Sequence, residues 1–496
     1  MEIILNFPCV SILLAMFSAI ISSALDRKWA KYLNTFVITL VAFLSLGTLC
    51  LTLDTGRSYT YVMGHFPAPF GNEIRFGSLE AGMALFFAVI MLLSLSGGRE
   101  KIRMEIDPAK EKLYYIMINL LLSSLLALVY TNDIFTAYVF VEINTISACG
   151  MIVITEHGRT IEAATRYMIM SLLGSGLFLI GICMLYDMTG HLLMEYIYAS
   201  ISDIMAAGTY RIPMMVTIAL IVVGLAIKSA LFPFHAWLPD AYGYSTVTSA
   251  AMLSSLVSKG YIFLLIKLIY RVIGFEVFYG SRIINVLFVF GLAGMIMGSV
   301  SAIRENDIRR MISYSSVAQI GYIYMGFGLG TAAGMVASVF HILSHAATKS
   351  LLFVAAVGLT DVSGGRKEFE ELTGAGYRNK MAGAAFLVGS LSMVGIPMFS
   401  GFISKLLFSQ AAVQSQGKML PTLVVLAVST VLNAIYFMKA VIRIYTPTDK
   451  EYEVKAFGHR TSYGVTLASF ILLNLVLGLF SQPITNWITQ GLMIMQ

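Results

Sequence analysis

Two histidines and a lysine recur at intervals of four residues within one apolar segment: His341, His345 and Lys349. Residues four apart lie on one face of a helix, so this spacing predicts a single stripe of titratable side chains. At about 1.5 Å per residue, the stripe extends over about 12 Å. Histidine exchanges protons near neutral pH, and such groups inside membranes mark proton relays. The flanking Ser344 and Thr348 are placed to hold water beside the stripe.

A metal site is the main alternative for this stripe. Two histidines four apart can bind zinc, but a zinc site needs three or four ligands, and lysine is a poor one. No carboxylate or cysteine lies nearby in the sequence. The cysteines lack the clustered spacing of an iron–sulfur or structural zinc site; they are Cys9, Cys50, Cys149 and Cys183. We therefore predict no metal and no cofactor.

A glutamate and a lysine in two further apolar segments are expected to form a pair. Glu142 lies eight residues into a segment that has no basic residue of its own, and Lys228, in another segment, is its natural partner. Such a pair in a low dielectric titrates as a coupled unit, and separating the two groups favours the neutral lysine. This behaviour is that of a proton switch. The alternative is a static ion pair that fixes helix packing.

Two more lysines extend the predicted path. Lys259 lies thirteen residues into its apolar segment, too deep for its ammonium group to reach the surface easily. Lys405 follows Pro397 and Gly401. Proline and glycine break a helix and free backbone groups that only water or protein can satisfy. We therefore expect Lys405 to line a wet cavity rather than face lipid.

Four other polar residues receive secondary assignments. His235 lies just beyond Pro233 and is either a gate or a helix-end residue, and Asp133 precedes the segment of Glu142. Lys267 and Arg271 lie near the end of their segment. Because long basic side chains reach from helix ends to the membrane surface, these two are interpreted as interface anchors with no chemical role.

The chain around these charges is strongly apolar. Of 496 residues, 58% are hydrophobic and 12% are charged, and the mean hydropathy is +0.81. Since soluble domains have about 25% charged residues, a soluble enzyme, a nucleic-acid-binding protein and a disordered protein are excluded. We predict an all-α polytopic membrane protein with about fourteen transmembrane helices. The expected spans are 3–25, 32–53, 78–96, 113–131, 134–155, 163–186, 212–232, 246–270, 283–303, 310–329, 332–358, 381–409, 420–442 and 462–482.

The distribution of lysine and arginine predicts the orientation. Connections that follow odd-numbered spans carry 22 of these residues, whereas the other connections and both termini together carry six. Positive residues gather on the cytoplasmic side of a membrane. We therefore expect a multi-pass protein of the cell (inner or plasma) membrane with both termini on the outer side.

Spans 7 and 12 share a lysine close to a proline, in opposite order. Lys228 precedes Pro233, whereas Lys405 follows Pro397. Corresponding interrupted helices in two halves point to inverted repeats and a transport site. We predict one membrane domain over 1–496. Its expected parts are spans 1–3 in 1–112, a first repeat of spans 4–8 in 113–272, a second repeat of spans 9–13 in 283–445, and span 14 with the tail in 460–496.

Five segments make the sequence resemble a known family, the antiporter-like, proton-translocating subunits shared by respiratory complex I, Mrp-type cation/proton antiporters and membrane-bound nickel–iron hydrogenases. In chain order they are TNDIFTAYVFVEINTIS at 131–147, KSALFPFHAWLPDA at 228–241, RENDIRRMISYSSVAQIGY at 304–322, FHILSHAATKSLLF at 340–353 and GIPMFSGFISKLLF at 395–408. They cover spans 4 through 12, and fourteen spans is the core number of the family. Together these motifs are highly specific.

The resemblance implies two inverted five-helix repeats with interrupted helices 7 and 12. It also implies roles for matching residues: a glutamate–lysine pair at Glu142 and Lys228, a connecting lysine at Lys259, a relay at His341, His345 and Lys349, and a terminal lysine at Lys405. The chain departs from the family at 242–249, where a usually proline-rich loop reads YGYSTVTS. The compact C-terminal part resembles the Mrp, hydrogenase or inner complex I type.

These observations predict a proton-translocating, antiporter-like subunit of a multisubunit ion-pumping complex. It is expected to have no catalytic site of its own, to belong to a redox-driven translocase, and to contact lipid and other membrane subunits but no nucleic acid. One alternative is a Na⁺/H⁺ antiporter component without redox coupling. Another is a non-conducting membrane scaffold. Five lysines within the spans against one clear carboxylate suit protons better than Na⁺, which prefers oxygen ligands.

Overall fold

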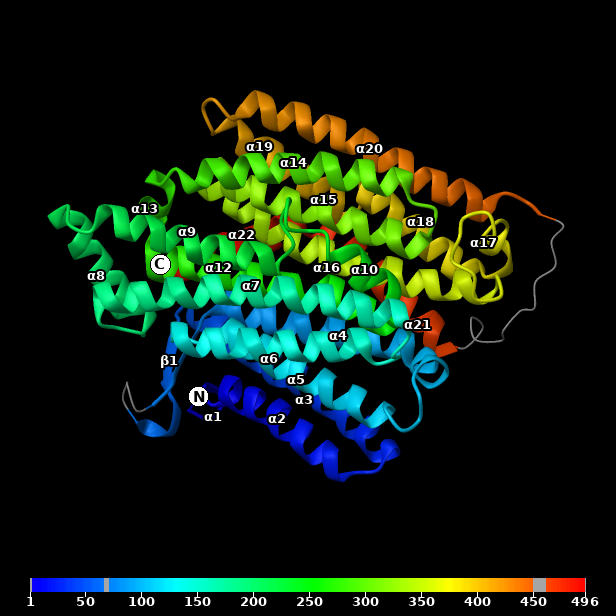
Figure 1. The fold of residues 1–496 in the computed structure, drawn as a ribbon, viewed down its shortest axis with the longest axis horizontal. Helices are drawn as coiled ribbons and strands as arrows, with labels where there is room; N and C mark the ends of the chain where they lie inside the picture. Colours follow the sequence, from blue (N-terminus) through cyan, green and yellow to red (C-terminus); the bar gives the residue numbers. More distant parts are fainter. Residues whose placement is uncertain (1, 67–70, 449–460, 496) are drawn as a thin grey trace.

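The computed structural model describes residues 2–66, 71–448 and 461–495 as a bundle of helices that run side by side (Figure 1). Among these residues, 12 helical stretches are long and apolar enough to cross a membrane. They are α2 (Phe7–Ala24), α3 (Arg27–Thr55), α4 (Ser78–Glu105), α5 (Glu111–Tyr130), α6 (Ile134–Val153), α7 (Gly158–Thr189), α9 (Arg211–Lys228), the continuous stretch Val247–Ile273, α14 (Ile283–Arg304), α16 (Ala332–Asp361), α20 (Met419–Tyr445) and α21 (Thr461–Leu479). The prediction of an all-α polytopic membrane protein is confirmed.

Two further helical regions lie where spans 10 and 12 were expected. The first, α15 (Ile308–Leu329), is long enough to cross but more polar. The second is divided into α18 (Lys380–Val394) and α19 (Ser400–Val413). At about 1.5 Å per residue, neither part alone crosses a hydrocarbon core of about 30 Å. The count of fourteen spans and the inverted repeats therefore stay predictions.

Short elements join the long helices at both ends of the bundle. They are α1 (Glu2–Leu5), η1 (Met63–His65), α8 (Met194–Ala207), α10 (Leu238–Tyr244), α13 (Phe275–Gly280), α17 (Ala375–Arg378), α22 (Ser481–Met495) and an antiparallel pair of strands, β1 (Tyr59–Val62) and β2 (Glu73–Phe76), with Tyr59 opposite Phe76. Figure 1 places α1, β1, α8 and α13 at one end of the bundle and α17 at the other.

The chain begins and ends at the same end of the bundle, where α1 and the last turn of α22 lie (Figure 1). This agrees with the expectation that both termini share one side of the membrane, and which side is outer stays a prediction. Most of the expected connection between spans 13 and 14, and residue 460 at the start of the last predicted part, lie outside the described residues.

Both predicted interruptions are present. Helix α9 ends at Lys228, and turns that include the cis peptide Phe232–Pro233 lead to α10. Helix α18 ends at Val394, where Gly395 adopts φ 90°, a conformation that glycine accepts without a steric penalty. The second interruption then continues through Pro397 to the start of α19. Pro233 and Pro397 thus lie in the interruptions, as the sequence indicated, whereas the predicted Gly401 lies inside α19 and Gly395 takes its place at the second break.

The eighth span has irregularities that were not predicted. It consists of α11 (Val247–Met252), the π-helical turn η2 (Leu253–Val257), α12 (Ser258–Leu268) and a second π-helical turn, η3 (Ile269–Ile273). The preceding loop, whose sequence departs from the family pattern, ends where the Thr246 hydroxyl accepts a hydrogen bond from the Ser249 backbone. Arg309 of α15 donates to the carbonyls of Tyr242 and Ser245 and holds the loop in place.

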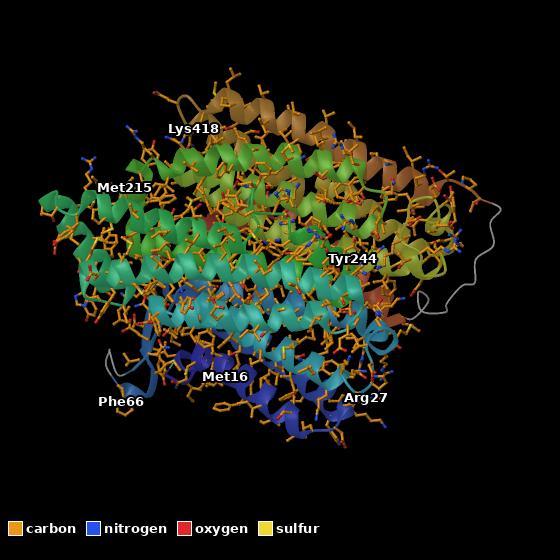
Figure 2. All side chains as sticks on the ribbon, in the orientation of Figure 1. Met16, Arg27, Phe66, Met215, Tyr244 and Lys418 are labelled. Atoms are coloured by element: carbon orange, nitrogen blue, oxygen red, sulfur yellow. The ribbon has the colours of Figure 1, made fainter. Side chains whose placement is uncertain are left out.

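The eighth span and α16 form the centre of the molecule. Val247–Ile273 is buried throughout and α16 is buried from Ala337 to Asp361, whereas α2, α3, α7, α14 and α20 expose large apolar side chains on the outside of the bundle. Figure 2 shows these side chains projecting around the bundle, with Met215 and Tyr244 labelled toward opposite ends. The apolar outer surface is suited to contact with lipid. The buried side chains of the two central helices contact only other parts of the protein.

Candidate functional site

The predicted pair of Glu142 and Lys228 is brought together, but loosely. The Lys228 ammonium nitrogen lies 3.9 Å from a Glu142 carboxylate oxygen, beyond hydrogen-bond length. Lys228 donates instead to the Thr145 hydroxyl, one turn along α6 from Glu142, and lies 5.4 Å from the centre of the Tyr261 ring. The Lys228 side chain is fully buried, whereas the Glu142 side chain is 23% exposed. The pair therefore joins a buried base to a carboxylate at the edge of the protein.

Close packing of helices fixes Lys228 at the end of α9. A Cβ atom on Gly174 of α7 would lie 2.8 Å from the Gly224 carbonyl oxygen and 3.0 Å from Lys228 Cγ. Only glycine allows α7 to approach the lysine stem this closely. Thr145 was not predicted as a partner of Lys228, although its position three residues after Glu142 places both on one face.

Lys259 lies between the pair and the histidine stripe. Its helix, α12, packs against both α9 and α16. The buried ammonium donates to the Ser254 carbonyl, in the π-helical turn η2, and makes no ion pair within the described part of the chain. The helix α16, against which α12 packs, carries His345 and Lys349. Lys259 thus lies between the Glu142–Lys228 pair and the histidine stripe, which are far apart in the sequence.

The two histidines of α16 form the predicted stripe. Their rings stack, with centroids 5.9 Å apart and planes inclined by 14°. His341 Nδ1 lies 2.5 Å from Ser404 Oγ, and Tyr322 stacks on the same ring at 5.4 Å. Within the described residues, Nε2 of His341 and both ring nitrogens of His345 are buried without a hydrogen-bond partner. Water satisfies buried polar atoms of this kind, and a file of waters conducts protons.

Lys349 completes the stripe but points toward α15. Its ammonium donates to the Ile312 carbonyl at 2.8 Å and to the Ser315 hydroxyl. The flanking hydroxyl groups, expected to hold water, bond to protein instead. Ser344 donates to Ser400 at 2.8 Å, and Thr348 donates to Asn474 at 2.8 Å. These contacts lock α16 against α19 and α21.

Lys405 lies at the second interruption, as predicted. Its ammonium donates to the Val394 carbonyl, the last residue of α18, at 2.7 Å and to the Thr430 hydroxyl at 2.9 Å. A helix leaves its last carbonyls unpaired, so the break creates the acceptor that holds the lysine. Ser404, the residue before Lys405, contacts His341. The stripe and Lys405 are therefore neighbours.

The two secondary candidates lie outside this row. Asp133 caps α6, because its carboxylate accepts a hydrogen bond from the Thr136 backbone at 2.6 Å. His235 stacks on Phe232 with ring centroids 5.3 Å apart, and burial lowers its pKa below 6.5. It lines a polar cavity of about 510 Å³ near the end of the bundle where α10 lies.

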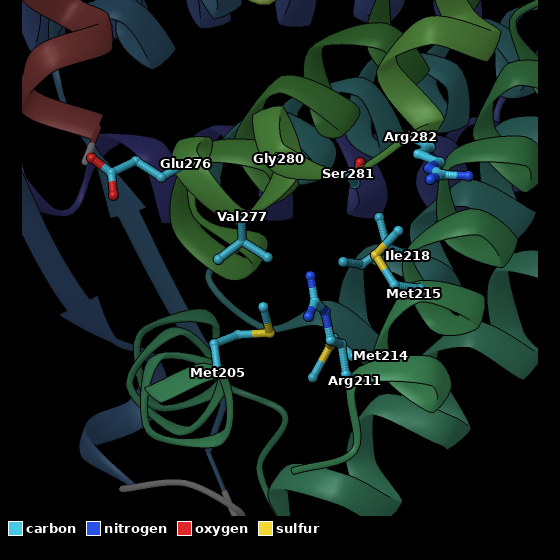
Figure 3. Close-up of a pocket in the computed structure, with 10 residues that line it drawn as sticks. All are labelled: Met205, Arg211, Met214, Met215, Ile218, Glu276, Val277, Gly280, Ser281 and Arg282. Carbon is cyan, nitrogen blue, oxygen red and sulfur yellow. The ribbon is translucent and has the colours of Figure 1, made fainter. Parts of the chain in front are cut away.

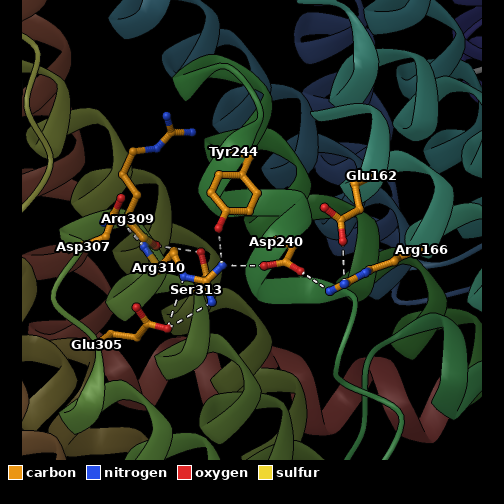
Figure 4. Close-up of polar contacts among 9 residues, drawn as sticks. All are labelled: Glu162, Arg166, Asp240, Tyr244, Glu305, Asp307, Arg309, Arg310 and Ser313. Carbon is orange, nitrogen blue, oxygen red and sulfur yellow. Dashed lines mark hydrogen bonds and ion pairs between the residues drawn. The ribbon is translucent and has the colours of Figure 1, made fainter. Parts of the chain in front are cut away.

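Ion pairs build one wall of this cavity, and the sequence did not predict them. Asp240 of α10 accepts hydrogen bonds from Arg166 at 2.8 Å and from Arg310 at 2.5 Å (Figure 4). Arg310 also pairs with Glu305 at 3.1 Å and donates to the Tyr244 hydroxyl at 2.9 Å. This network ties α7, α10 and α15 together beside the first interruption.

The interpretation of Lys267 and Arg271 as surface-reaching anchors is wrong. Both side chains are buried. Lys267 donates to the carbonyls of Val129 at 2.8 Å and Thr131 at 2.6 Å, because the end of α5 leaves these groups without helical partners. Arg271 forms an ion pair with buried Glu80 of α4 at 2.6 Å. Both residues fasten helices together at the end of the eighth span.

Comparison with known proteins identifies the chain. Residues 131–432 match the family described as NADH:quinone oxidoreductase/Mrp antiporter, transmembrane. The chain belongs to this family. The matched part of this antiporter-family chain contains every residue of the row, from Glu142 to Lys405.

Similar proteins come from several complexes. NADH-quinone oxidoreductase subunit N of Desulforudis audaxviator is 30% identical over 446 residues, 89% of this chain and 86% of that protein. In fold, the chain matches a chain of the membrane-bound sulfane sulfur reductase, an archaeal respiratory membrane complex, with TM-score 0.88, 24% identity and coverage of 100% and 98%. It also matches a chain of the Mrp complex from Dietzia sp. DQ12-45-1b, with TM-score 0.87, 21% identity and coverage of 99% and 97%.

In this antiporter-family chain, the titratable side chains lie on helices that pack around one buried centre. They come from α6, α9, α12, α16 and α19. The partners of the buried lysines are mostly hydroxyl and carbonyl oxygens. Such an arrangement accepts and releases protons without forming or breaking any other covalent bond.

Proposed function

We propose that this chain is a proton-translocating, antiporter-like subunit of a multisubunit complex in the cell membrane, with other membrane subunits as partners. Membership of the NADH:quinone oxidoreductase/Mrp antiporter family supports the activity. The similar folds in an archaeal respiratory membrane complex and in an Mrp complex support assembly with other subunits. The end of the bundle that is rich in lysine and arginine faces the cytoplasm.

One observation carries the proposal: the titratable groups from Glu142 to Lys405 lie on helices that pack against one another. Lys228 lies 3.9 Å from Glu142, α12 with Lys259 packs against both α9 and α16, and Ser404 beside Lys405 contacts His341. Each charge at the centre of a bilayer costs ~2.5–3.5 kcal/mol even on the lenient insertion scale. A scaffold can fasten helices with buried charges that are paired, as Arg271 is with Glu80, but it gains nothing from His345, whose ring nitrogens have no hydrogen-bond partner within the described residues. A proton path needs such groups, because each buried step must offer a group that can take up and release a proton.

In the proposed path, protons enter at the Glu142–Lys228 pair and pass through Lys259. They continue along the stripe of α16 and leave by Lys405. The separation of 3.9 Å leaves Lys228 free to approach Glu142 or to remain with Thr145. Lys259 lies on α12, which packs against α16, so a positive charge on Lys259 repels a second positive charge on the stripe.

Partner subunits or an opposing cation gradient supply the energy. Moving one charge against 100 mV costs ~2.3 kcal/mol, and the path has no step that releases energy. In this proposal the two interrupted helices belong to inverted repeats, in 113–272 and 283–445. The break after Lys228 and the break before Lys405 support this organisation.

Proton uptake by vesicles that contain the intact complex tests the proposal. Glu142→Gln and Lys228→Met are expected to lower uptake at least tenfold, because each removes a titratable group from the path, while the subunits still copurify. The matched controls are Glu156→Gln and Lys110→Met, which remove a surface ion pair of 2.5 Å and leave uptake unchanged. Normal uptake by assembled Glu142 and Lys228 variants overturns the proposal.

The same vesicles separate the alternatives. Proton exchange that depends on Na⁺ and needs no electron donor identifies an antiporter component without redox coupling. A scaffold predicts a different pattern, in which His341→Gln and His345→Gln impair assembly more than proton movement. The proposed function predicts the reverse order for these two variants.

A further inference from the structure

A second cavity lies at the opposite end of the bundle from His235 and is independent of the proposed proton path. Its volume is about 420 Å³, and it lies between α8, α9, α13 and the start of α14 (Figure 3). Met205, Met214, Ile218 and Val277 provide apolar walls. Arg211 and Arg282 provide the basic groups. A small number of polar groups in an apolar cavity is typical of a ligand site.

The charge in this cavity is positive and unbalanced. Figure 3 shows the guanidinium group of Arg211 inside the cavity, whereas the Glu276 carboxylate and the Arg282 guanidinium lie at opposite edges and point outward. Among the described residues, neither Arg211 nor Arg282 forms an ion pair. Helices α9 and α14 also begin here, and neither has a side-chain cap on its first backbone N–H groups. Helix starts favour negative charge, so the cavity suits an anion.

The basic residues are also unusual for this end of the protein. The connections after even-numbered spans and the termini together carry only six lysines and arginines, and Arg211 and Arg282 are two of the six. Three of the others lie elsewhere: Arg271 is paired with Glu80, Arg57 is exposed, and Lys418 donates to a carbonyl. This end of the bundle has few basic residues, and a third of them line this one cavity.

The position of Arg211 favours a place for this cavity at the depth of lipid headgroups. Arg211 is the first residue of a membrane span, and basic residues at span ends lie at the membrane surface. Outside the cavity, Ile212 and Val216 are 78% and 45% exposed and lie one turn apart on α9, and Val286 of α14 is 47% exposed. The apolar walls therefore continue into a surface suited to acyl chains.

We propose that this cavity binds the phosphate headgroup of an anionic phospholipid, with the acyl chains along the exposed faces of α9 and α14. Free phosphate can pair with the arginines, but it makes no favourable contact with the apolar walls. A neighbouring polypeptide would need a carboxylate at Arg211 and would cover the cavity from lipid. An anionic lipid satisfies both the charge and the apolar surface.

Photolabelling tests the proposal on the complex reconstituted in phosphatidylcholine vesicles. The probe is a phosphatidylglycerol that carries a photoactivatable group close to its headgroup, and mass spectrometry locates the labelled peptides. We expect labelling of the peptides that contain Met205, Met214 and Val277. Arg211→Gln is expected to reduce this labelling about tenfold, equivalent to about 1.4 kcal/mol, and Arg211→Lys is expected to retain most of it.

The matched control is Arg57→Gln, which removes an exposed arginine from the same end of the bundle without touching the cavity and is expected to change nothing. Excess inorganic phosphate is expected not to compete with the probe. Equal labelling by a phosphatidylcholine probe, unchanged labelling in Arg211→Gln, competition by inorganic phosphate, or labelling of another subunit in place of these peptides each overturns the proposal. Proton uptake is a separate readout, so failure here leaves the proposed function untouched.

Discussion

At the scale of single residues, neutral oxygen atoms hold the lysines of the proposed path. Lys228 donates to a threonine hydroxyl, Lys259 to a backbone carbonyl, and Lys405 to a carbonyl and a hydroxyl. A carboxylate in contact would favour the charged lysine at all times. Hydroxyl and carbonyl acceptors do not, so each lysine can lose its proton without leaving an unpaired negative charge behind.

Thr145 tests this idea directly. Thr145→Val keeps the shape of the side chain but removes the hydroxyl that holds Lys228 away from Glu142, so the lysine is expected to close onto the carboxylate. A tighter Lys228–Glu142 ion pair releases its proton more slowly. Because one net hydrogen bond is worth about 1 kcal/mol, proton uptake should fall roughly fivefold. The control is Thr165→Val on the exposed face of α7, where the hydroxyl bonds only within its own helix. Unchanged uptake in Thr145→Val contradicts the role of this hydroxyl.

The sequence predicted the charged members of the row but not their neutral partners. A lysine or histidine in an apolar span stands out because burying a charge is costly. Thr145, Ser404 and Asn474 do not stand out, because hydroxyl and amide groups are common in membrane helices and pair across them. Their contacts join residues 63 to 126 positions apart in the chain, so only the tertiary packing reveals them. Lys267 was misinterpreted for the same reason, since its carbonyl acceptors lie at the end of α5.

At the scale of helices, breaks supply the acceptors that side chains of the path use. The end of α18 presents the Val394 carbonyl to Lys405, and the turn η2 presents the Ser254 carbonyl to Lys259. Pro397 made the break after α18 predictable. The turn η2 reads LSSLV, with neither residue, so nothing local marked it. Irregular turns of this kind within helices are frequent at functional sites.

Gly395 tests the contribution of the break after α18. It has φ 90°, and an added Cβ would lie 2.9 Å from Cδ of Lys405. Gly395→Ala is therefore expected to move Lys405 away from the Val394 carbonyl and to lower proton uptake several-fold. Gly417→Ala is the matched control, because Gly417 has φ 81° but no atom within 4 Å of an added Cβ. Equal uptake by the two variants would mean that backbone strain alone explains any loss.

At the scale of the whole molecule, the two ends of the bundle differ in chemistry. One end carries the ion-pair network of Asp240 and Arg310, and the other carries the cavity of Arg211. The alternation of basic connections along the sequence was enough to predict this difference, because the positive-inside rule needs only the positions of lysine and arginine between spans. The residues that form the cavity walls at each end come from helices that are far apart in the sequence. Their arrangement depends on tertiary packing, so it could not be predicted.

Labelling of single cysteines tests the orientation of the molecule. In a chain with its own cysteines replaced, Ser202→Cys lies in α8 and Glu370→Cys lies in the connection before α17, and both positions are exposed. A membrane-impermeant maleimide applied to intact cells is expected to label the first and not the second. Labelling of Glu370→Cys alone reverses the orientation and places the basic end outside.

The central claim is that protons cross the molecule along one buried row of side chains, and Lys259 is the position that joins its two halves. Lys259→Met preserves the length and apolar stem of the side chain but cannot carry a proton. Proton uptake by vesicles with the fully assembled complex is expected to fall to the level of empty vesicles. Uptake at the normal rate in this variant, with all subunits present, would contradict the account.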